Sequence, residues 1–506
     1  REAGERRPQL LLVPEQASFE TERRFCRENG NQAGRYGEVL SFTRLENRVL
    51  SLGGGAAEPV LDAGGRLLVL YAALRSVQAN LTVYAMPSQK PAFLTSLLTT
   101  LDELKSYCIT GEQLTQVGEE TEGLDGEKLR DLGLIFGAYE AMTARGALDP
   151  RDRLTRLAEK LRRFPFFQGQ DVYLDGFTDF TPQQGLVLAE LLRQAHSVTL
   201  ALTYGEGAGE EAVFAPARKT LAWIKGLAAK VGCPVEEEAL PAGEWERTPP
   251  LRHLEQALFA HPMPSYTGPW DGSIVVHELP SPREEVAWAA GEIRALVRQG
   301  RVRYRDIVVT ARSMDPYWEQ LEGVFAQYDI PLFQADKTDL LQKPLFTLIT
   351  AALDAVNGGY LYEDMFRYLK TGLAGLSLPE CDQLENYVLT WDIWGSRWTG
   401  AGGWTRHPGG YHQRFTPQDE ETLETLNALR LRVIQPLERL RKNAGGTIGE
   451  QVLALYQFLE EIHAPEHLEA RSAALLHQGE PELARQYSQL WEIFCRALEQ
   501  CAALLG

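Results

Sequence analysis

The sequence predicts an α/β fold with two parallel-sheet domains, each extended by a helical region. Three observations lead to this prediction. Short apolar runs bounded by polar, Gly or Pro residues recur along the chain, as is typical of buried strands. A long helical pattern separates the second run from the third, which indicates one domain inserted into another. Further along, strand-like and helix-like segments alternate, which favours a parallel sheet with right-handed crossovers.

The first domain is assigned to residues 1–50 plus 165–245, with a helical insertion at 51–164. Asp149-Pro150 predicts a helix start near the end of the insertion, because a capping residue followed by proline suits a first turn. Thr181, Pro182 and Gln184 have capping-box spacing and predict another helix from Pro182. The predicted buried strands are QLLLVPEQ at 9–16, YGEVLSFTR at 36–44, DVYLDGF at 171–177 and SVTLALTY at 197–204.

The second α/β domain is assigned to residues 250–350, after a linker at 244–253. A nearly all-helical region follows at 351–506, interrupted by a Gly- and Trp-rich loop at 394–415. The elements expected in the second domain are strands at 273–281, 305–312 and 330–336, and helices at 283–300 and 315–328.

Composition bounds the class of protein. At 506 residues, 44% hydrophobic and 24% charged, the chain is an ordinary globular protein of three or four domains, at about 150 residues per domain. Its apolar runs, such as LLLV at 10–13, are too short to cross a bilayer. No signal peptide is visible, and the opening REAGERRPQ lacks an initiator Met, so we expect a fragment.

Six scattered cysteines without a CxxC pair indicate a reducing, cytoplasmic setting. Cys495 and Cys501 fall on an amphipathic helical pattern and are expected in the core. The formal net charge of −18 excludes a surface that is basic throughout, but it leaves open a local basic channel that meets phosphates.

The stretch VYLDGFTDFTPQQ at 172–184 places Asp175 at the carboxyl end of a predicted buried strand. Nucleotide-hydrolysing α/β proteins hold magnesium at such a position. In working motors the next residue is an acid that activates water, whereas here it is Gly176. The phosphate-cradling pattern GxxxxGK[ST] is absent from the 506 residues. Both observations argue against ATP hydrolysis by these residues, and a P-loop preceding Arg1 stays open.

The order of these segments resembles the 1A–1B–2A–2B plan of superfamily 1 helicases, with two RecA-like domains and helical 1B- and 2B-like insertions. DGFTDFTPQQ resembles their magnesium-and-glutamate box in degenerate form, with Asp175, Gly176 and Asp179 in its positions. Five segments in order resemble, more specifically, the B subunits of AddAB/RexAB helicase–nucleases: LVPEQASFETE, VLSFTRLENRVL, YLDGFTDFTPQQ, DIPLFQADKTDLLQKPLFTLITAALD and QLENYVLTWDIWGSRWT.

The resemblance implies a subunit without a working motor, in a heterodimer whose A subunit carries the ATP-driven motor. Such a subunit threads single-stranded DNA from duplex ends, scans it for the recombination hotspot Chi, and serves double-strand break repair. The family's 5'-3' exonuclease domain, with magnesium-binding acids and a 4Fe-4S cluster, would lie outside this chain. We expect no catalytic residue, metal or cofactor in these residues, and no membrane association.

The resemblance also implies which residues read the strand. Reading bases requires flat side chains that stack and forked or amide groups that bind base edges. The family positions for Chi and DNA binding are occupied here by Gln16, Ser18, Phe42, Arg44, Asn47 and Phe177. Ser18 stands where Thr is often found, and Asn47 where some members have an aromatic residue, so the recognised sequence stays open.

Four of these residues have a purely structural alternative. Phe42 and Phe177 could belong to the core, Arg44 could pair with Glu46 or another surface acid, and Gln16 could cap a loop. Asp175 and Asp179 are interpreted as capping or loop-bonding carboxylates.

Two further groups have functional interpretations that we disfavour. His407 and His412 lack neighbouring ligands at metal-site spacing. Trp394, Arg397, Trp398 and Trp404 resemble a single-strand groove in composition, although a packed domain-contact loop is favoured over it.

Two alternatives for the whole chain remain: an active superfamily 1 helicase with its P-loop upstream, or a protein-only scaffold that never contacts DNA.

Overall fold

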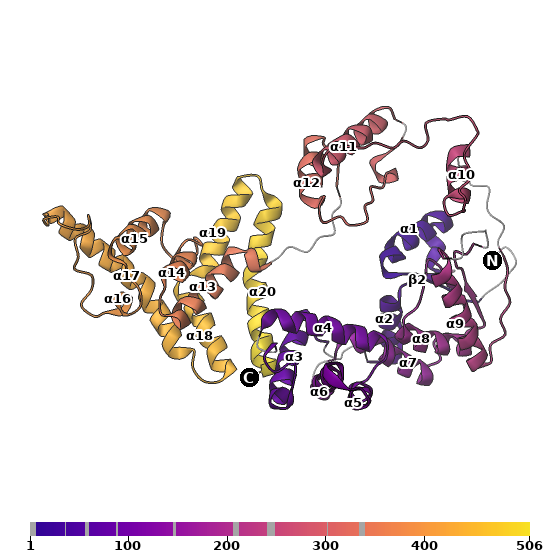
Figure 1. Ribbon diagram of the computed structural model, residues 1–506, viewed down its shortest axis with the longest axis horizontal. Coiled ribbons are helices and arrows are strands. Elements are labelled where there is room, and N and C mark those ends of the chain that lie inside the picture. Colours follow the sequence, from indigo (N-terminus) through magenta and orange to yellow (C-terminus); the bar gives the residue numbers. More distant parts are fainter. Residues whose placement is uncertain are drawn as a thin grey trace. The chain divides into compact units, whose positions relative to one another are not determined.

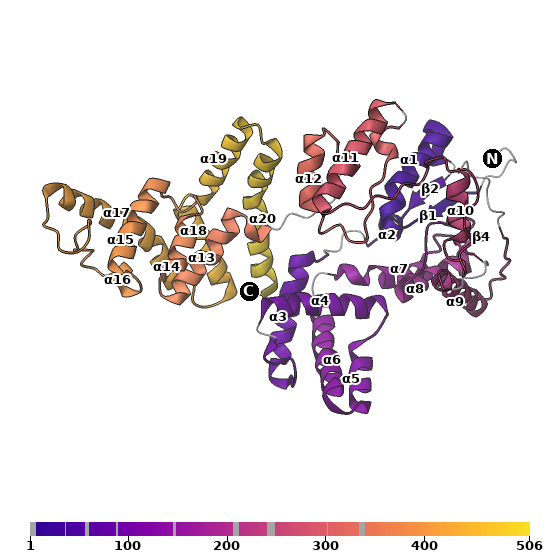
Figure 2. The same ribbon diagram turned by 45° about the horizontal axis from the view of Figure 1, so that its top comes forward.

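The computed structural model describes residues 7–35, 37–55, 60–87, 90–144, 148–205, 212–239, 248–300, 302–332 and 340–505. The chain divides into two compact units (Figures 1 and 2). Unit 1 comprises Arg1–Tyr204, Phe214–Glu237 and Leu340–Gly506, and unit 2 comprises Gly205–Val213 and Glu238–Asp339.

A four-stranded, all-parallel sheet lies at the centre of the first half of unit 1, in the order β2-β1-β3-β4. The register places Leu12 opposite both Leu40 and Leu174. All four strands predicted for this domain are confirmed, but each is only four residues long. The strands are β1 (Gln9–Leu12), β2 (Gly37–Leu40), β3 (Asp171–Leu174) and β4 (Ser197–Leu200).

Helices cover the sheet and enclose a core that includes Leu10, Leu12, Leu45, Leu174 and Val187. Helix α7 packs against both α2 and α8, and α9 packs against α8. The helices are α1 (Ser18–Asn29), α2 (Phe42–Gly53), α7 (Arg153–Arg163), α8 (Pro182–Gln194) and α9 (Ala215–Val231).

A mostly helical stretch separates β2 from β3, and its helices α3–α6 share a core that includes Leu70, Phe136 and Tyr139. Asp149 lies at the insertion's exit, where its side chain accepts the Arg151 amide N–H and so caps the turn that leads into α7. This confirms the predicted helix start at Asp149-Pro150. The helices are α3 (Ala63–Val77), α4 (Pro91–Ser106), α5 (Gly111–Glu120) and α6 (Gly123–Thr143).

The third part of unit 1 is helical over its described residues and has the largest of their hydrophobic cores, against which the partly buried Cys495 packs. Its last helix returns to the insertion: Gln500 Nε2 donates to Asp62 Oδ2 at 2.8 Å, and Figures 1 and 2 both show α20 reaching α3. The helices are α13 (Pro344–Gly358), α14 (Tyr362–Leu369), α15 (Leu378–Trp391), α16 (Ser396–Thr399), α17 (Pro417–Asn443), α18 (Ile448–Glu461), α19 (Ala464–His477) and α20 (Pro481–Leu505).

Unit 2 departs from the prediction. Its helices α11 (Pro282–Arg298) and α12 (Trp318–Gln327) confirm two predicted helices and share a small core. The predicted strands at 273–281 and 305–312 are wrong, since neither segment joins a ladder among the described residues. Their valines are exposed, Val276 by 88% and Val308 by 81%. An apolar run becomes a strand only where a neighbouring strand satisfies its backbone.

Two other predictions for unit 2 are affected. The predicted strand at 330–336 forms no ladder over 330–332, and its remainder lies outside the described residues. The predicted linker at 244–253 runs into helix α10 (Pro249–Ala257), with 244–247 outside the described residues. The described residues therefore form a mostly helical α/β protein with one small parallel sheet, and the second parallel sheet that was expected is not found among them.

No helix in the described ranges combines the length and the apolar character needed to cross a bilayer.

Candidate nucleic-acid interface

The carboxyl ends of the four parallel strands meet at one edge of the sheet, where ligands bind in open α/β folds. Hydrogen bonds join the segments that leave these strand ends. The Thr43 amide donates to Glu15 Oε1 at 2.9 Å, and the Asp175 amide donates to the Leu12 carbonyl at 3.1 Å. Helix α2 begins directly after β2, because Ser41 Oγ accepts the Arg44 amide N–H as its cap. Phe42 and Arg44 therefore belong to a helix, not to the predicted strand 36–44.

The degenerate magnesium box lies on the loop after β3. Asp175, Gly176 and Asp179 are all exposed there. Gly176 has φ +79°, and a Cβ at this position would come 3.4 Å from Pro14 Cδ. A glycine suits this left-handed backbone, whereas the acid of a working motor would be strained in it. The cap of α8 is Thr181, in a capping box with Gln184 as predicted, so neither aspartate caps that helix.

No cluster of three or more His, Cys, Asp or Glu side chains that could hold a metal occurs within the described ranges. The two candidate histidines, His407 and His412, differ in burial. His407 is buried, with the Gly409 amide N–H donating to its Nδ1 at 2.9 Å and its Nε2 3.2 Å from the Arg414 carbonyl. Both of its ring nitrogens are thus engaged by the loop itself. His412 is exposed.

Three of the six predicted DNA-contact residues are mostly buried. Phe42 is 5% exposed and Phe177 9%, and their rings meet edge to face with centroids 5.8 Å apart. Phe180 extends the cluster, its ring 4.9 Å from that of Phe177. Ser18, at the first turn of α1, is 8% exposed. In this conformation the rings of Phe42 and Phe177 pack in the core under the loops, which agrees with the structural alternative given for them.

The other three residues, Gln16, Arg44 and Asn47, reach the surface. Arg44 Nη1 donates to Glu22 Oε2 at 2.8 Å, with side-chain exposures of 40% and 42%. The partner is thus Glu22 of α1; Glu46, the partner considered from sequence, is buried. The hydrogen bond from Arg44 lowers the pKa of Glu22, and the bond to Glu22 raises the pKa of Arg44. Both groups are therefore ionised at neutral pH.

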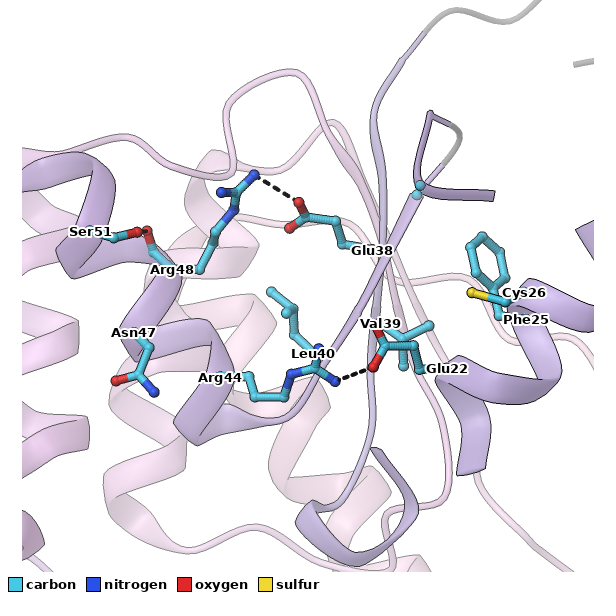
Figure 3. A pocket seen from close by; sticks show the side chains of 12 residues that line it. Glu22, Phe25, Cys26, Glu38, Val39, Leu40, Arg44, Asn47, Arg48 and Ser51 are labelled. Carbon is cyan, nitrogen blue, oxygen red and sulfur yellow. Dashed lines mark hydrogen bonds and ion pairs between the residues drawn. The ribbon is translucent and has the colours of Figure 1, made fainter. Parts of the chain in front are cut away.

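A pocket of about 570 Å³ lies beside β2, between α1 and α2. Figure 3 shows Arg44 and Arg48 of α2 reaching two acids, Glu22 and Glu38, across the pocket. The Arg48 Nη2–Glu38 Oε1 distance is 2.7 Å. Sequence reasoning missed Arg48, although it stands one helical turn after Arg44 and this spacing places both on one face. The lining residues are Glu22, Phe25, Cys26, Gly34, Gly37–Leu40, Arg44, Asn47, Arg48 and Ser51.

The Trp-rich loop in the all-helical region is packed. Trp398 and Trp404 are 0% and 7% exposed and belong to the core, while Trp394 is 53% exposed. Arg397 is held locally, since its Nη1 donates to the Asp392 carbonyl at 2.5 Å. This arrangement supports the packed-loop interpretation over an open stacking groove.

The sequence of the chain matches one family of known proteins. A family model described as ADDB, N-terminal, matches residues 1–255 of the 506. Proteins named as the B subunit of an ATP-dependent helicase/deoxyribonuclease are similar along the chain. The one from Acetivibrio thermocellus is 32% identical over 511 residues, covering 99% of this chain and 44% of the relative.

Two further relatives give the same result. The proteins of that name from Pelotomaculum thermopropionicum and Desulforudis audaxviator are 33% and 34% identical, covering 99% and 100% of this chain. The matched share of these relatives is 44% and 45%. The chain thus spans less than half the length of the relatives it matches.

Proposed function

Because the chain belongs to the AddB family, the B subunits of ATP-dependent helicase/deoxyribonucleases, we propose that it is a non-motor, DNA-reading part of such a complex. In this proposal the carboxyl edge of the β2-β1-β3-β4 sheet binds single-stranded DNA and scans it for the Chi hotspot during double-strand break repair. These residues break no bond. The partner is the AddA/RexA-type motor subunit, and the complex works in the cytoplasm on duplex ends.

The observation that supports the proposal is that Gln16, Arg44 and Asn47 reach the surface on the segments that follow β1 and β2, at the sheet edge where Gly176 follows β3. An amide and a guanidinium present the donors and acceptors that base edges bind. Phe42, Phe177 and Ser18 lie beneath and fix the loops, so their contribution is to position the exposed residues. Asp175 and Asp179 remain as polar loop residues without a nucleotide role.

The domain plan of superfamily 1 helicases is part of the proposal. Four hydrophobic cores among the described residues support it; they include Leu12, Phe136, Phe325 and Leu348. We infer a 1A-like domain (1–50 plus 165–245), a 1B-like insertion (51–164), a 2A-like domain (250–350) and a 2B-like region (351–506). The cores differ from these bounds at two places: Leu157 and Leu161 of α7 belong to the sheet core, and Leu345 and Leu348 of α13 belong to the core of the last region. Magnesium and a 4Fe-4S cluster would belong to the nuclease part of the family, outside this chain.

Binding to a fluorescein-labelled dT20 strand, followed by anisotropy at 50 mM NaCl, tests the reading edge. We expect Arg44→Ala to weaken binding roughly tenfold, the scale of one bidentate contact, and Gln16→Ala to weaken it less. The matched control is Arg24→Ala, which removes an exposed arginine of α1 that pairs with Glu28 at 3.6 Å. Equal affinity of all four proteins would reject the proposal in favour of a protein-only scaffold.

Sequence preference has its own test. Single strands selected from a random pool by the wild type should share a short motif. Asn47→Trp, which adds a stacking surface at the family's aromatic position, should change that motif. An unchanged motif would remove Asn47 from the reading edge.

The alternative of an ATP-driven motor makes a different prediction. Turnover of ATP by a chain that retains Gly176, above that of a protein-free blank, would favour it.

A further inference from the structure

We infer that the sugar–phosphate backbone of the bound single strand runs along the outer edge of the sheet, beside β2, and contacts Arg48 and its neighbouring arginines. This inference rests on the proposed function and extends the site beyond the reading edge. Among the described residues β2 is the terminal strand in the order β2-β1-β3-β4, so its outer edge pairs with no further strand there.

Two adjoining pockets form the track, which we call the β2 channel. The first, of about 570 Å³, reaches Arg44 at the carboxyl end of β2. The second, of about 320 Å³, extends to Arg7 and Phe166 toward the amino end. Both are lined by Gly34, Gly37, Glu38 and Arg48, so together they run the length of the strand.

Four arginines line the channel: Arg44 and Arg48 in the first pocket, and Arg7 and Arg35, with Arg48 again, in the second. Although the net charge of the chain is −18, these four arginines face two acids in the pocket linings, Glu22 and Glu38. Phosphates are bound by such guanidinium groups, which offer several donors in a fork. Since Arg44 also belongs to the reading edge, the channel continues that edge without a break.

Two acids moderate the charge. Glu22 holds Arg44 at 2.8 Å and Glu38 holds Arg48 at 2.7 Å. Side-chain exposures in both pairs are between 40% and 45%, and ion pairs this exposed are weak. A phosphate can therefore replace either carboxylate and use the guanidinium donors that the pair leaves unused. Because each phosphate must displace a carboxylate, the affinity for the sugar–phosphate backbone is lowered. A lower affinity suits a DNA strand that must move past the reading edge.

Arg48 and Glu38 are the residues on which to test the channel, because neither belongs to the predicted reading set. The purified chain is titrated with fluorescein-labelled dT20 between 50 and 200 mM NaCl. Loss of one phosphate contact should reduce the slope of log K against log salt by about 0.7. The ratio of wild-type to Arg48→Ala affinity should therefore be roughly 2.5-fold larger at 50 mM than at 200 mM NaCl.

Two variants sharpen the result. Arg48→Lys, which keeps the charge, should retain the wild-type slope. Glu38→Gln, which frees Arg48 from its carboxylate, should raise affinity roughly two- to fivefold at 50 mM NaCl, the range of an exposed ion pair. Arg24→Ala again serves as the control outside the channel, and far-UV circular dichroism with a melting curve verifies that each variant folds.

An Arg48→Ala slope equal to that of Arg24→Ala overturns the inference. If Arg44→Ala weakens binding in the same experiment, the proposed function survives that failure. A wild type that does not bind dT20 at 50 mM NaCl overturns both. The channel is supported if the slope of log K against log salt is reduced for Arg48→Ala and unchanged for Arg48→Lys.

Discussion

Phe42 and Phe177 meet edge to face, with ring centroids 5.8 Å apart and planes at 69°. One ring follows β2 and the other follows β3, and β1 lies between these strands. The pair therefore joins two loops of the carboxyl edge across a strand. Because both rings are buried, the two phenylalanines stabilise these loops whether or not DNA is bound.

We expect Phe42→Ala to lower the free energy of unfolding by about 3–5 kcal/mol, as for large-to-small changes in a core. In a double-mutant cycle with Phe177→Ala, the coupling should be about 0.5–1.5 kcal/mol. Urea unfolding followed by circular dichroism measures both quantities. Phe42→Leu serves as the control that keeps apolar volume. If it remained folded and still lost dT20 binding, the ring would be contacting DNA directly.

Asp149 should be a key residue of the insertion. Its fully buried carboxylate lies 2.9 Å from Arg66 Nε and 3.1 Å from Lys105 Nζ, and it accepts the Tyr139 hydroxyl at 2.8 Å. Replacing one member of a buried charge cluster leaves the others uncompensated. Asp149→Asn is therefore expected to cost about 3–5 kcal/mol of stability, read from the urea midpoint. A change no larger than that of the exposed control Asp125→Asn would contradict this role.

The same cluster has a defined pH dependence. Burial alone would raise the pKa of Asp149, but Lys105, the Arg151 amide and Arg66 outweigh it and lower the pKa. A depressed carboxyl pKa contributes stability above the unfolded value, and this is lost as pH falls through the folded value. The contribution should thus be constant from about pH 5 to 8 and disappear only below the ordinary range of aspartate.

Glu46 should act in the opposite direction. Burial raises its pKa, although Arg153 and Arg156 partly oppose the rise. Between the unfolded and folded values the native state binds more protons, so stability falls as pH rises through that window. Glu46→Gln is expected to flatten this fall and to stabilise the chain modestly at pH 7. Urea midpoints at pH 4 and pH 7 measure the effect; a less stable variant at pH 7 would show that its pair with Arg153, at 3.4 Å, outweighs burial.

The sheet of unit 1 was predictable because its strands are apolar runs whose partners are also apolar runs of the same chain. Helix α8 was predictable from local cap chemistry, in which the Thr181 side chain accepts the Gln184 amide. Helix α11 has a similar cap on Ser281, a residue that the sequence pattern had assigned to a strand. The runs containing Val276 and Val308 have the same composition as true strands, yet they lack neighbours among the described residues. Strand composition is local, whereas strand formation depends on a distant partner.

The candidate site was predictable only in part, for the same reason. Arg44 was found from its family position, but its partner Glu22 is set by the approach of α1 to α2, and no local pattern marks it. The burial of Phe42 and Phe177 likewise follows from packing around β1. Glu38 of β2 meets Arg48 because the helix turns back over its own strand.

Substitutions of Gly176 test whether a residue with a side chain, such as the acid of a working motor, fits the backbone conformation at this position. Its φ of +79° is left-handed, a conformation that costs a residue with a Cβ about 1–2 kcal/mol. Gly176→Ala should lose this much stability in urea unfolding, and Gly176→Asn should lose less, because Asn tolerates that region. Gly226→Ala is the matched control, since this α9 glycine has open space around it. If Gly176→Ala were as stable as wild type, the left-handed backbone would not be the reason for a glycine at position 176, and the reason would have to be functional.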